Sequence, residues 1–183
     1  GTPIDRPSKI DGRPLPSLLE IVEMCASRIP ASNRQTIVHG DFCFSNIFYD
    51  ARSEAIRVID PRGMDQSNNV TIHGDIRYDI GKLHHSAVGG YDGILAANYR
   101  LIRNGTLDFD LRLDLSESQL AVGGLFRNME FAGVRVDSSI DAISVLLFLS
   151  MLPLHADDPD RQMALLANGL RLFAAMDGAR SNG

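Results

Sequence analysis

Two carboxylates and an amide lie close together in the sequence and could hold a metal ion. Asp41 is followed five residues later by Asn46, and Asp60 ends an apolar run. The residues between Asn46 and Asp60 predict a hairpin with strands at 47–49 and 55–59, which would return Asp60 to the loop that holds the other two. Carboxylate and amide oxygens are ligands that Mg²⁺ accepts. The spacing therefore predicts a magnesium site at the open end of this hairpin.

Such a site suits a metal ion that is already bound to a phosphate group. The nucleotide and water then supply most of the ligands, so few protein oxygens are needed. Phosphoryl transfer also needs a group that orients the attacking hydroxyl and accepts its proton. That task fits the carboxylate that does not bind the metal.

The triplet His-Gly-Asp occurs twice, at residues 39–41 and 73–75, and we ask which copy carries chemistry. The second copy has Ile80 where an Asn would be needed, and it leads into a predicted helix. A carboxylate at the start of that helix, Asp79, would accept backbone N–H bonds and interact favourably with the helix dipole. The first copy is therefore the chemical one.

These residues resemble the motifs of the aminoglycoside phosphotransferase and choline kinase-like family, a branch of the protein-kinase-like fold. The resemblance covers about residues 17–88. A single His-Gly-Asp triplet is a weak signal, whereas three motifs in the family's order are specific. The matching motifs are His39-Gly40-Asp41 with Asn46, then Ile59-Asp60, then Gly74-Asp75-Ile76-Arg77-Tyr78-Asp79-Ile80-Gly81-Lys82-Leu83.

The resemblance implies a role for each of these side chains. Asp41 would be the catalytic base, and Asn46 and Asp60 would hold Mg²⁺ and, through it, ATP. His39 would support the catalytic loop, and Asp79 would anchor the backbone of that loop from the following helix. The implied reaction moves the γ-phosphate of ATP to a hydroxyl of a small molecule, such as a sugar, an amino alcohol or an aminoglycoside-like compound.

The family carries its acceptor specificity in the helical part of the fold. Acidic side chains there would face a cationic acceptor, although acids on a surface helix serve solubility equally well. The acidic residues considered for this role are Asp75, Asp108, Asp110, Asp114 and Glu117.

The expected fold is α+β and mostly helical, a kinase-like C-terminal lobe in which the small β-hairpin carries the catalytic and metal loops. Residues 1–16 hold four of the eight prolines and predict an extended leader, and residues 17–183 predict the lobe. No glycine-rich strand-turn-strand and no strand lysine precede His39, so we expect the nucleotide-binding N-terminal lobe to be absent from this chain. Besides the hairpin and a short strand at 37–38, helices are predicted at 17–30, 77–88, 92–103, 116–132, 138–155 and 158–176.

Composition narrows the classes of partner. The net charge of −5 provides no basic face for nucleic acid. The longest apolar run, 142–152, is shorter than the roughly 20 residues that span a membrane, so it predicts a buried core helix. Two isolated cysteines suit a reducing cytoplasm.

Two other functions stay open at this point. One is a non-catalytic kinase-like module that binds a ligand or a partner; the missing lobe favours it, and retention of all three candidate ligands argues against it. The other is a metal-dependent phosphohydrolase built from His39, Asp41, His73 and Asp75. It would need both triplets to meet at one Zn²⁺ or Mn²⁺ ion.

Overall fold

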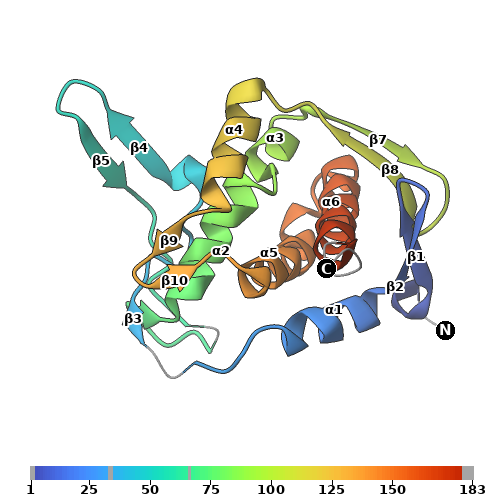
Figure 1. Cartoon of the computed structure of the whole chain (residues 1–183), viewed down its shortest axis with the longest axis horizontal. Helices are drawn as coiled ribbons and strands as arrows, with labels where there is room; N and C mark the ends of the chain where they lie inside the picture. The colour runs from blue at the N-terminus through green and yellow to red at the C-terminus, as the bar shows by residue number, and fades with distance from the viewer. Residues whose placement is uncertain (1–2, 33–34, 66, 179–183) are drawn as a thin grey trace.

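The computed structural model of this chain describes residues 3–32, 35–65 and 67–178. The predicted leader and lobe also include residues 1–2, 33–34, 66 and 179–183, which lie outside the described residues. Within the described ranges the chain is α+β, with six α-helices and several small sheets. A four-stranded sheet lies at one end and a hairpin projects at the other, with the helices between them (Figure 1).

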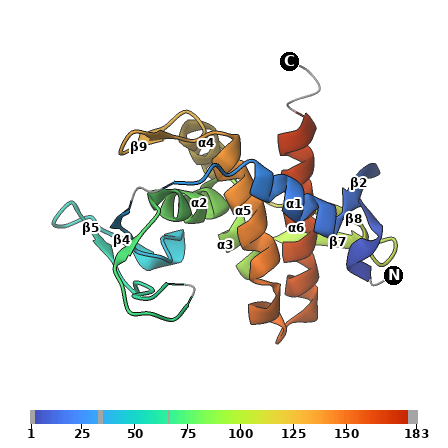
Figure 2. The ribbon, with the colours of Figure 1, turned by 90° about the horizontal axis from the view of Figure 1, so that it is seen from below.

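The helices form the centre of the molecule. Helix α5 contacts α1, α2 and α6 (Figure 2). Its Val145 and Phe148 are fully buried. The apolar run predicted as a core helix is therefore confirmed as α5. The helices are α1 (Leu18–Ser27), α2 (Ile76–Ala87), α3 (Tyr91–Leu95), α4 (Glu117–Phe126), α5 (Ser138–Ser150) and α6 (Pro159–Gly178).

Local signals place the ends of several helices correctly. Ser17 caps α1, and its hydroxyl and Glu20 exchange hydrogen bonds in a capping box. Ser116 and Gln119 do the same for α4. Pro153 follows α5 in a short 3₁₀ turn, η3 (Leu152–His155), because proline cannot continue the α-helical hydrogen bonds. Two further 3₁₀ turns are η1 (Pro3–Asp5) and η2 (Phe44–Asn46).

The four-stranded sheet corrects the prediction of a leader. Strands β1 (Pro7–Ile10) and β2 (Arg13–Ser17) form an antiparallel hairpin, and β1 also pairs in parallel with β8 (Asp108–Leu113). Strand β7 (Tyr99–Arg103) completes the order β2-β1-β8-β7. The segment is extended, as expected, but it is part of the core, since Ile10 is only 2% exposed.

The turn of this hairpin explains why the prolines do not prevent a sheet. Asp11 and Gly12 both have positive φ, which is the Asp-Gly type I′ pattern that favours a two-residue hairpin. Pro14 and Pro16 lie in β2, an edge strand, where a missing N–H costs least.

The predicted helix at 92–103 is wrong beyond its first turn. The backbone of Ala97 has φ +58°, which ends the helical conformation after α3, and residues 99–103 form β7 instead. Pairing with β8, whose Phe109 and Leu111 are buried, overrides the weak helical pattern. The predicted helix at 116–132 is also too long.

The remaining strands are short and pair in twos. The predicted hairpin is confirmed as β4 (Ile47–Asp50) paired with β5 (Ala55–Val58). Strand β3 (Thr36–Ile37) pairs with β6 (His73–Gly74). The two residues of β3, just before the first His-Gly-Asp triplet, therefore lie beside the second triplet. The last residues of the predicted helix at 116–132 belong instead to a hairpin, formed by β9 (Glu130–Phe131) and β10 (Val134–Arg135).

Candidate functional site

The loop that follows β3 carries the first His-Gly-Asp triplet and is held by the start of α2. Asp79, in the first turn of α2, is 8% exposed. Its two carboxylate oxygens accept the backbone N–H groups of His39, at 2.7 Å, and of Gly40, at 2.8 Å. A carboxylate that accepts two backbone N–H bonds fixes both peptide groups at once. This is the arrangement that the resemblance implies for Asp79.

His39 connects this loop to the end of the β4–β5 hairpin. Its Nε2 lies 2.9 Å from the carbonyl oxygen of Ile59, and its Nδ1 accepts the N–H of Asp41 at 3.3 Å. The Nδ1 atom must therefore be unprotonated, and Nε2 donates to the carbonyl group. With both ring nitrogens engaged, His39 supports the loop and has no nitrogen left for a metal ion.

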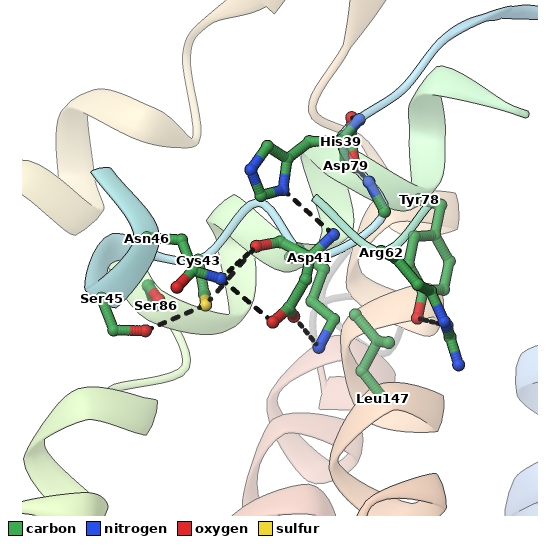
Figure 3. Close-up of polar contacts among 12 residues, drawn as sticks. His39, Asp41, Cys43, Ser45, Asn46, Arg62, Tyr78, Asp79, Ser86 and Leu147 are labelled. Carbon is green, nitrogen blue, oxygen red and sulfur yellow. Dashed lines mark hydrogen bonds and ion pairs between the residues drawn. The ribbon is translucent and has the colours of Figure 1, made fainter. Parts of the chain in front are cut away.

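The carboxylate of Asp41 is bonded on both oxygens (Figure 3). Its Oδ1 lies 2.8 Å from the Nζ of Lys82, and its Oδ2 accepts the Nδ2 of Asn46 at 3.1 Å. The same Asn46 nitrogen donates to the carbonyl oxygen of Asp41 at 2.9 Å. The Asn46 amide therefore turns its nitrogen toward Asp41, which leaves its oxygen available to a cation.

Asp60 lies where the hairpin ends, in a segment that is bonded to the loop that follows β3. The N–H of Ile59 donates to the carbonyl oxygen of Asn46 at 3.1 Å, and the N–H of Arg62 donates to that of His39 at 2.8 Å. Asp60 itself has φ +56°, a left-handed conformation that Asp tolerates better than most residues. Its exposed carboxylate makes no hydrogen bond or ion pair to any residue that the structure describes.

Asp41 and Asp60 line the same cleft, which has a volume of about 850 Å³. One side of the cleft is polar and includes Lys82 and Arg62, whose guanidinium donates to the Tyr78 hydroxyl at 3.0 Å. The apolar part of the lining comes from α5, η3, the residue between them and Ile29, which lies two residues beyond the end of α1. This apolar part consists of Ile29, Ile143, Leu146, Leu147, Met151, Pro153 and Leu154.

Lys82 is the site residue that the sequence did not single out. It follows Asp79 by three positions on α2, so both side chains lie on the face of the helix that meets the loop after β3. That spacing is the signal that could have identified it. Its side chain is 13% exposed and lines the cleft beside Asp41.

The acidic residues considered for a cationic acceptor do not line this cleft. Asp75 caps α2 and pairs with Arg77, whose hydrogen bonds and charge lower the pKa of Asp75 although burial opposes this. Asp108 pairs with Lys9 in the sheet at the other end of the molecule. The remaining three, Asp110, Asp114 and Glu117, lie on or beyond β8.

The two triplets do not converge on a metal site of the phosphohydrolase kind. His73 is exposed in β6, and Asp75 is committed to Arg77. The described part of the chain contains no group of three or more His, Cys, Asp or Glu side chains that could hold a metal ion.

No family model matches this chain, and neither a curated protein nor a solved structure matches it. Its function is therefore inferred from the geometry described above. Among the described helices, none combines the length and the apolar character that crossing a membrane requires.

Proposed function

We propose that this chain is the catalytic and acceptor-binding lobe of an ATP-dependent phosphotransferase that acts on a hydroxyl of a small molecule. The observation that carries the proposal is that Asp41 and Asp60 line one cleft. Both are supported by a loop whose backbone is bonded to Asp79 and to residues 59–62. The fold would be a protein-kinase-like C-terminal lobe. A second, N-terminal lobe would complete the nucleotide-binding site.

Asp41 is the group best placed to act on the acceptor hydroxyl. Its carboxylate is fixed by Lys82 and Asn46, so it presents a defined direction to the cleft. A carboxylate in hydrogen-bond reach of the hydroxyl orients it and accepts its proton as the phosphoryl group is transferred. Most of the catalytic effect in this class of reaction comes from positioning and charge neutralisation.

The residues present fit a Mg²⁺ ion bound to a nucleotide. Asp60 offers an exposed carboxylate with no other partner in the described chain, and Asn46 offers its amide oxygen. When bound, the ion neutralises charge on the phosphate oxygens. The protein's part is to hold these two ligands beside Asp41, which it does through the Ile59–Asn46 backbone hydrogen bond.

The acidic residues lie away from the cleft, so they do not indicate a cationic acceptor. The apolar side chains of α5 and η3 that line the cleft restrict the class of acceptor that fits. An acceptor with an apolar body and one reactive hydroxyl fits these side chains better than a polycation does. We also propose a cytoplasmic location, which is supported by two free cysteines that are both buried.

Calorimetric titration with ATP, with and without Mg²⁺, tests the proposal on this chain and on the full-length gene product. We expect Mg²⁺-dependent binding that weakens by about tenfold or more in Asp60→Asn, because a metal ligand is lost. Asp65→Asn is the matched control, since the Asp65 side chain bonds, among the described residues, to residues 67 and 69 of its own loop. Phosphoryl transfer to small alcohols is the second readout.

Equal binding by Asp60→Asn and the unmodified protein would contradict the assignment of Asp60. Absence of Mg²⁺-dependent binding by the full-length product would contradict the phosphotransferase itself. It would favour a kinase-like module that binds a ligand or a partner without catalysis.

A further inference from the structure

Lys82 occupies a position that neither the motif nor the proposed roles account for. Its ammonium group is 2.8 Å from Asp41 Oδ1, and the aliphatic part of its side chain is largely buried. The pair lies at the cleft, where both residues contribute to the lining. A cation therefore touches the carboxylate that would act on the acceptor hydroxyl.

The chemistry of the cleft gives this cation a second partner. A phosphoryl group that approaches Asp41 brings negative charge toward a carboxylate, and like charges at this distance repel. A cation between them offsets the repulsion. Of the residues that line the cleft, the two cationic ones are Lys82 and Arg62. Arg62 donates to the Tyr78 hydroxyl, whereas Lys82 is the one paired with Asp41.

We propose that Lys82 is the phosphoryl-binding cation of this site, and that Asp41 holds it in place until a phosphate group arrives. This inference rests on the proposed function and specifies how the phosphate is bound. Oxygens of a polyphosphate compete with Asp41 Oδ1 for the ammonium group. When they take it, Oδ1 is released and can accept a hydrogen bond from the acceptor hydroxyl. Arrival of the phosphate thus makes Asp41 available.

The position of Lys82 on α2 suits this exchange. Asp79, one turn earlier, fixes the same helix to the backbone of residues 39 and 40. The backbone of Lys82 is therefore held at a constant distance from the loop. Its side chain has four methylene groups and a compact charge that can turn between two anions without moving the helix. No bond is made or broken in the exchange; only the partner of the ammonium group changes.

A purely structural ion pair makes a different prediction. If Lys82 only orients Asp41, removing the charge of Asp41 has no effect on anion binding that depends on Lys82. If Lys82 is a phosphoryl site, removing that charge frees the ammonium group and strengthens anion binding. The two readings are separated by a double-mutant cycle between the two residues.

The probe is sodium tripolyphosphate without Mg²⁺, titrated into the isotope-labelled chain at low ionic strength and followed by NMR. Low salt is needed because screening weakens interactions of exposed charges. We expect Asp41→Asn to bind the probe about fivefold more tightly, the size expected for loss of one competing ion pair near the surface. Lys82→Met should bind severalfold more weakly, and Asp41→Asn with Lys82→Met should bind no more tightly than Lys82→Met.

Lys9→Met is the matched control, since Lys9 is also paired with an aspartate, Asp108, at 3.4 Å, but lies in the sheet at the far end. It should bind the probe like the unmodified chain. Lys82→Arg keeps the charge and should retain most of the binding. If Lys82→Met does not fold, Lys82→Gln, which keeps a polar side chain of similar length, takes its place in the same cycle with Asp41→Asn.

Two results would overturn the inference: binding by Lys82→Met equal to that of the unmodified chain, or an equal gain from Asp41→Asn with and without Lys82. The titration contains neither Mg²⁺ nor nucleotide, so its result does not depend on whether the chain is a phosphotransferase. Lys82-dependent binding of tripolyphosphate without any phosphoryl transfer by the full-length product would leave an anion site and reject the phosphotransferase. Phosphoryl transfer that depends on Asp60 but not on Lys82 would support the phosphotransferase and reject Lys82 as its phosphoryl-binding cation.

Discussion

Gly40 shows how far one missing atom shapes the candidate site. Its backbone has φ +77°, and a Cβ at this position would lie 2.7 Å from the Cβ of Arg62. The loop after β3 and residues 59–62 approach so closely because the Arg62 N–H donates to the carbonyl oxygen of His39. The close approach of the loop that carries Asp41 to the segment that carries Asp60 therefore depends on a glycine at position 40.

Replacing Gly40 by alanine should destabilise the protein for two separable reasons. An alanine in the left-handed region costs about 1 kcal/mol, and the contact with the rigid Arg62 Cβ adds about 1–3 kcal/mol. Gly133 has φ +81° with nothing near its missing Cβ, so Gly133→Ala pays the backbone cost alone. Urea unfolding of both variants measures the difference. Equal losses would show that the close approach to Arg62 is not a constraint.

A single titrating residue also sets a pH dependence. His85 is fully buried against the rings of Tyr91 and Phe148. Burial, followed by the charges of Lys82 and other histidines, lowers its pKa well below the usual 6.5. The unfolded chain therefore takes up a proton below about pH 6.5 that the folded chain refuses, so this stability is present at higher pH and is lost as pH falls.

Replacement of His85 by phenylalanine should flatten that dependence. Between pH 7 and pH 5 the unmodified chain loses up to about 1.4 kcal/mol per pH unit from this residue, whereas His85→Phe loses none from it. The measurement is the slope of the unfolding free energy against pH, which is insensitive to the packing change that the substitution itself causes. His73→Phe, at an exposed histidine, is the control and should keep the slope. Identical slopes in all three chains would contradict the assignment.

At the scale of elements, α2 is the part that joins the site to the core. Its N-terminal turn holds the loop after β3 through Asp79, and its middle packs on α5. The two helices are close because Gly81 has no side chain: a Cβ there would lie 2.4 Å from Ile143 Cγ2. The position of Asp41 relative to the apolar side chains of α5 is therefore fixed by helix packing.

Gly81→Ala should destabilise although alanine is the better helix former. The gain in helix propensity is about 1 kcal/mol, but α2 and α5 must separate, which costs about 2–4 kcal/mol. Gly124→Ala in α4 meets nothing within 4 Å and should stabilise by about 1 kcal/mol. Thermal unfolding that moves both variants in the same direction would refute the packing argument.

The elements that the sequence predicts well are those with local signals. Capping residues and apolar periodicity locate α1, α2, α5 and α6 to within a few residues, and the motif spacing brings Asp41 and Asn46 together. The sheet is missed because its central pairing joins β1 to β8, which no local pattern records. The ion pair of Lys82 is missed for the same reason, since a helix and a loop supply its two halves.

At the scale of the whole molecule, the sheet closes the end of the helical core opposite the hairpin. Ile10 and Leu15 join Phe109 and Leu111 in one buried cluster with α6. Arg13 reaches α6 as well, donating to the carbonyl oxygen of Ala174 at 2.7 Å. Residues that looked like a leader are therefore part of the main core.

Ile10→Ala tests this role of the N-terminal strands. Ile10 is 2% exposed, and its truncation should cost about 2–5 kcal/mol, because a cavity is left in the cluster. Ile102, in the same sheet but 52% exposed, is the control, and Ile102→Ala should cost about 1 kcal/mol or less. Denaturant unfolding would contradict the fold at this end if the two losses were the same.

The parallel pairing of β1 with β8 has a consequence for the order in which the molecule folds. The Asp11 carboxylate meets the Leu111 N–H across 100 residues of sequence, and Arg13 meets Ala174 across 161. Contacts this distant form late, because the entropy of closing a long loop must be overcome first. During synthesis the β1–β2 hairpin is complete long before its neighbours exist, and one edge of β1 stays open to other chains until β8 emerges. The speed of that last docking step, and with it the competition between refolding and aggregation, is therefore set at the end of the molecule that carries the four-stranded sheet.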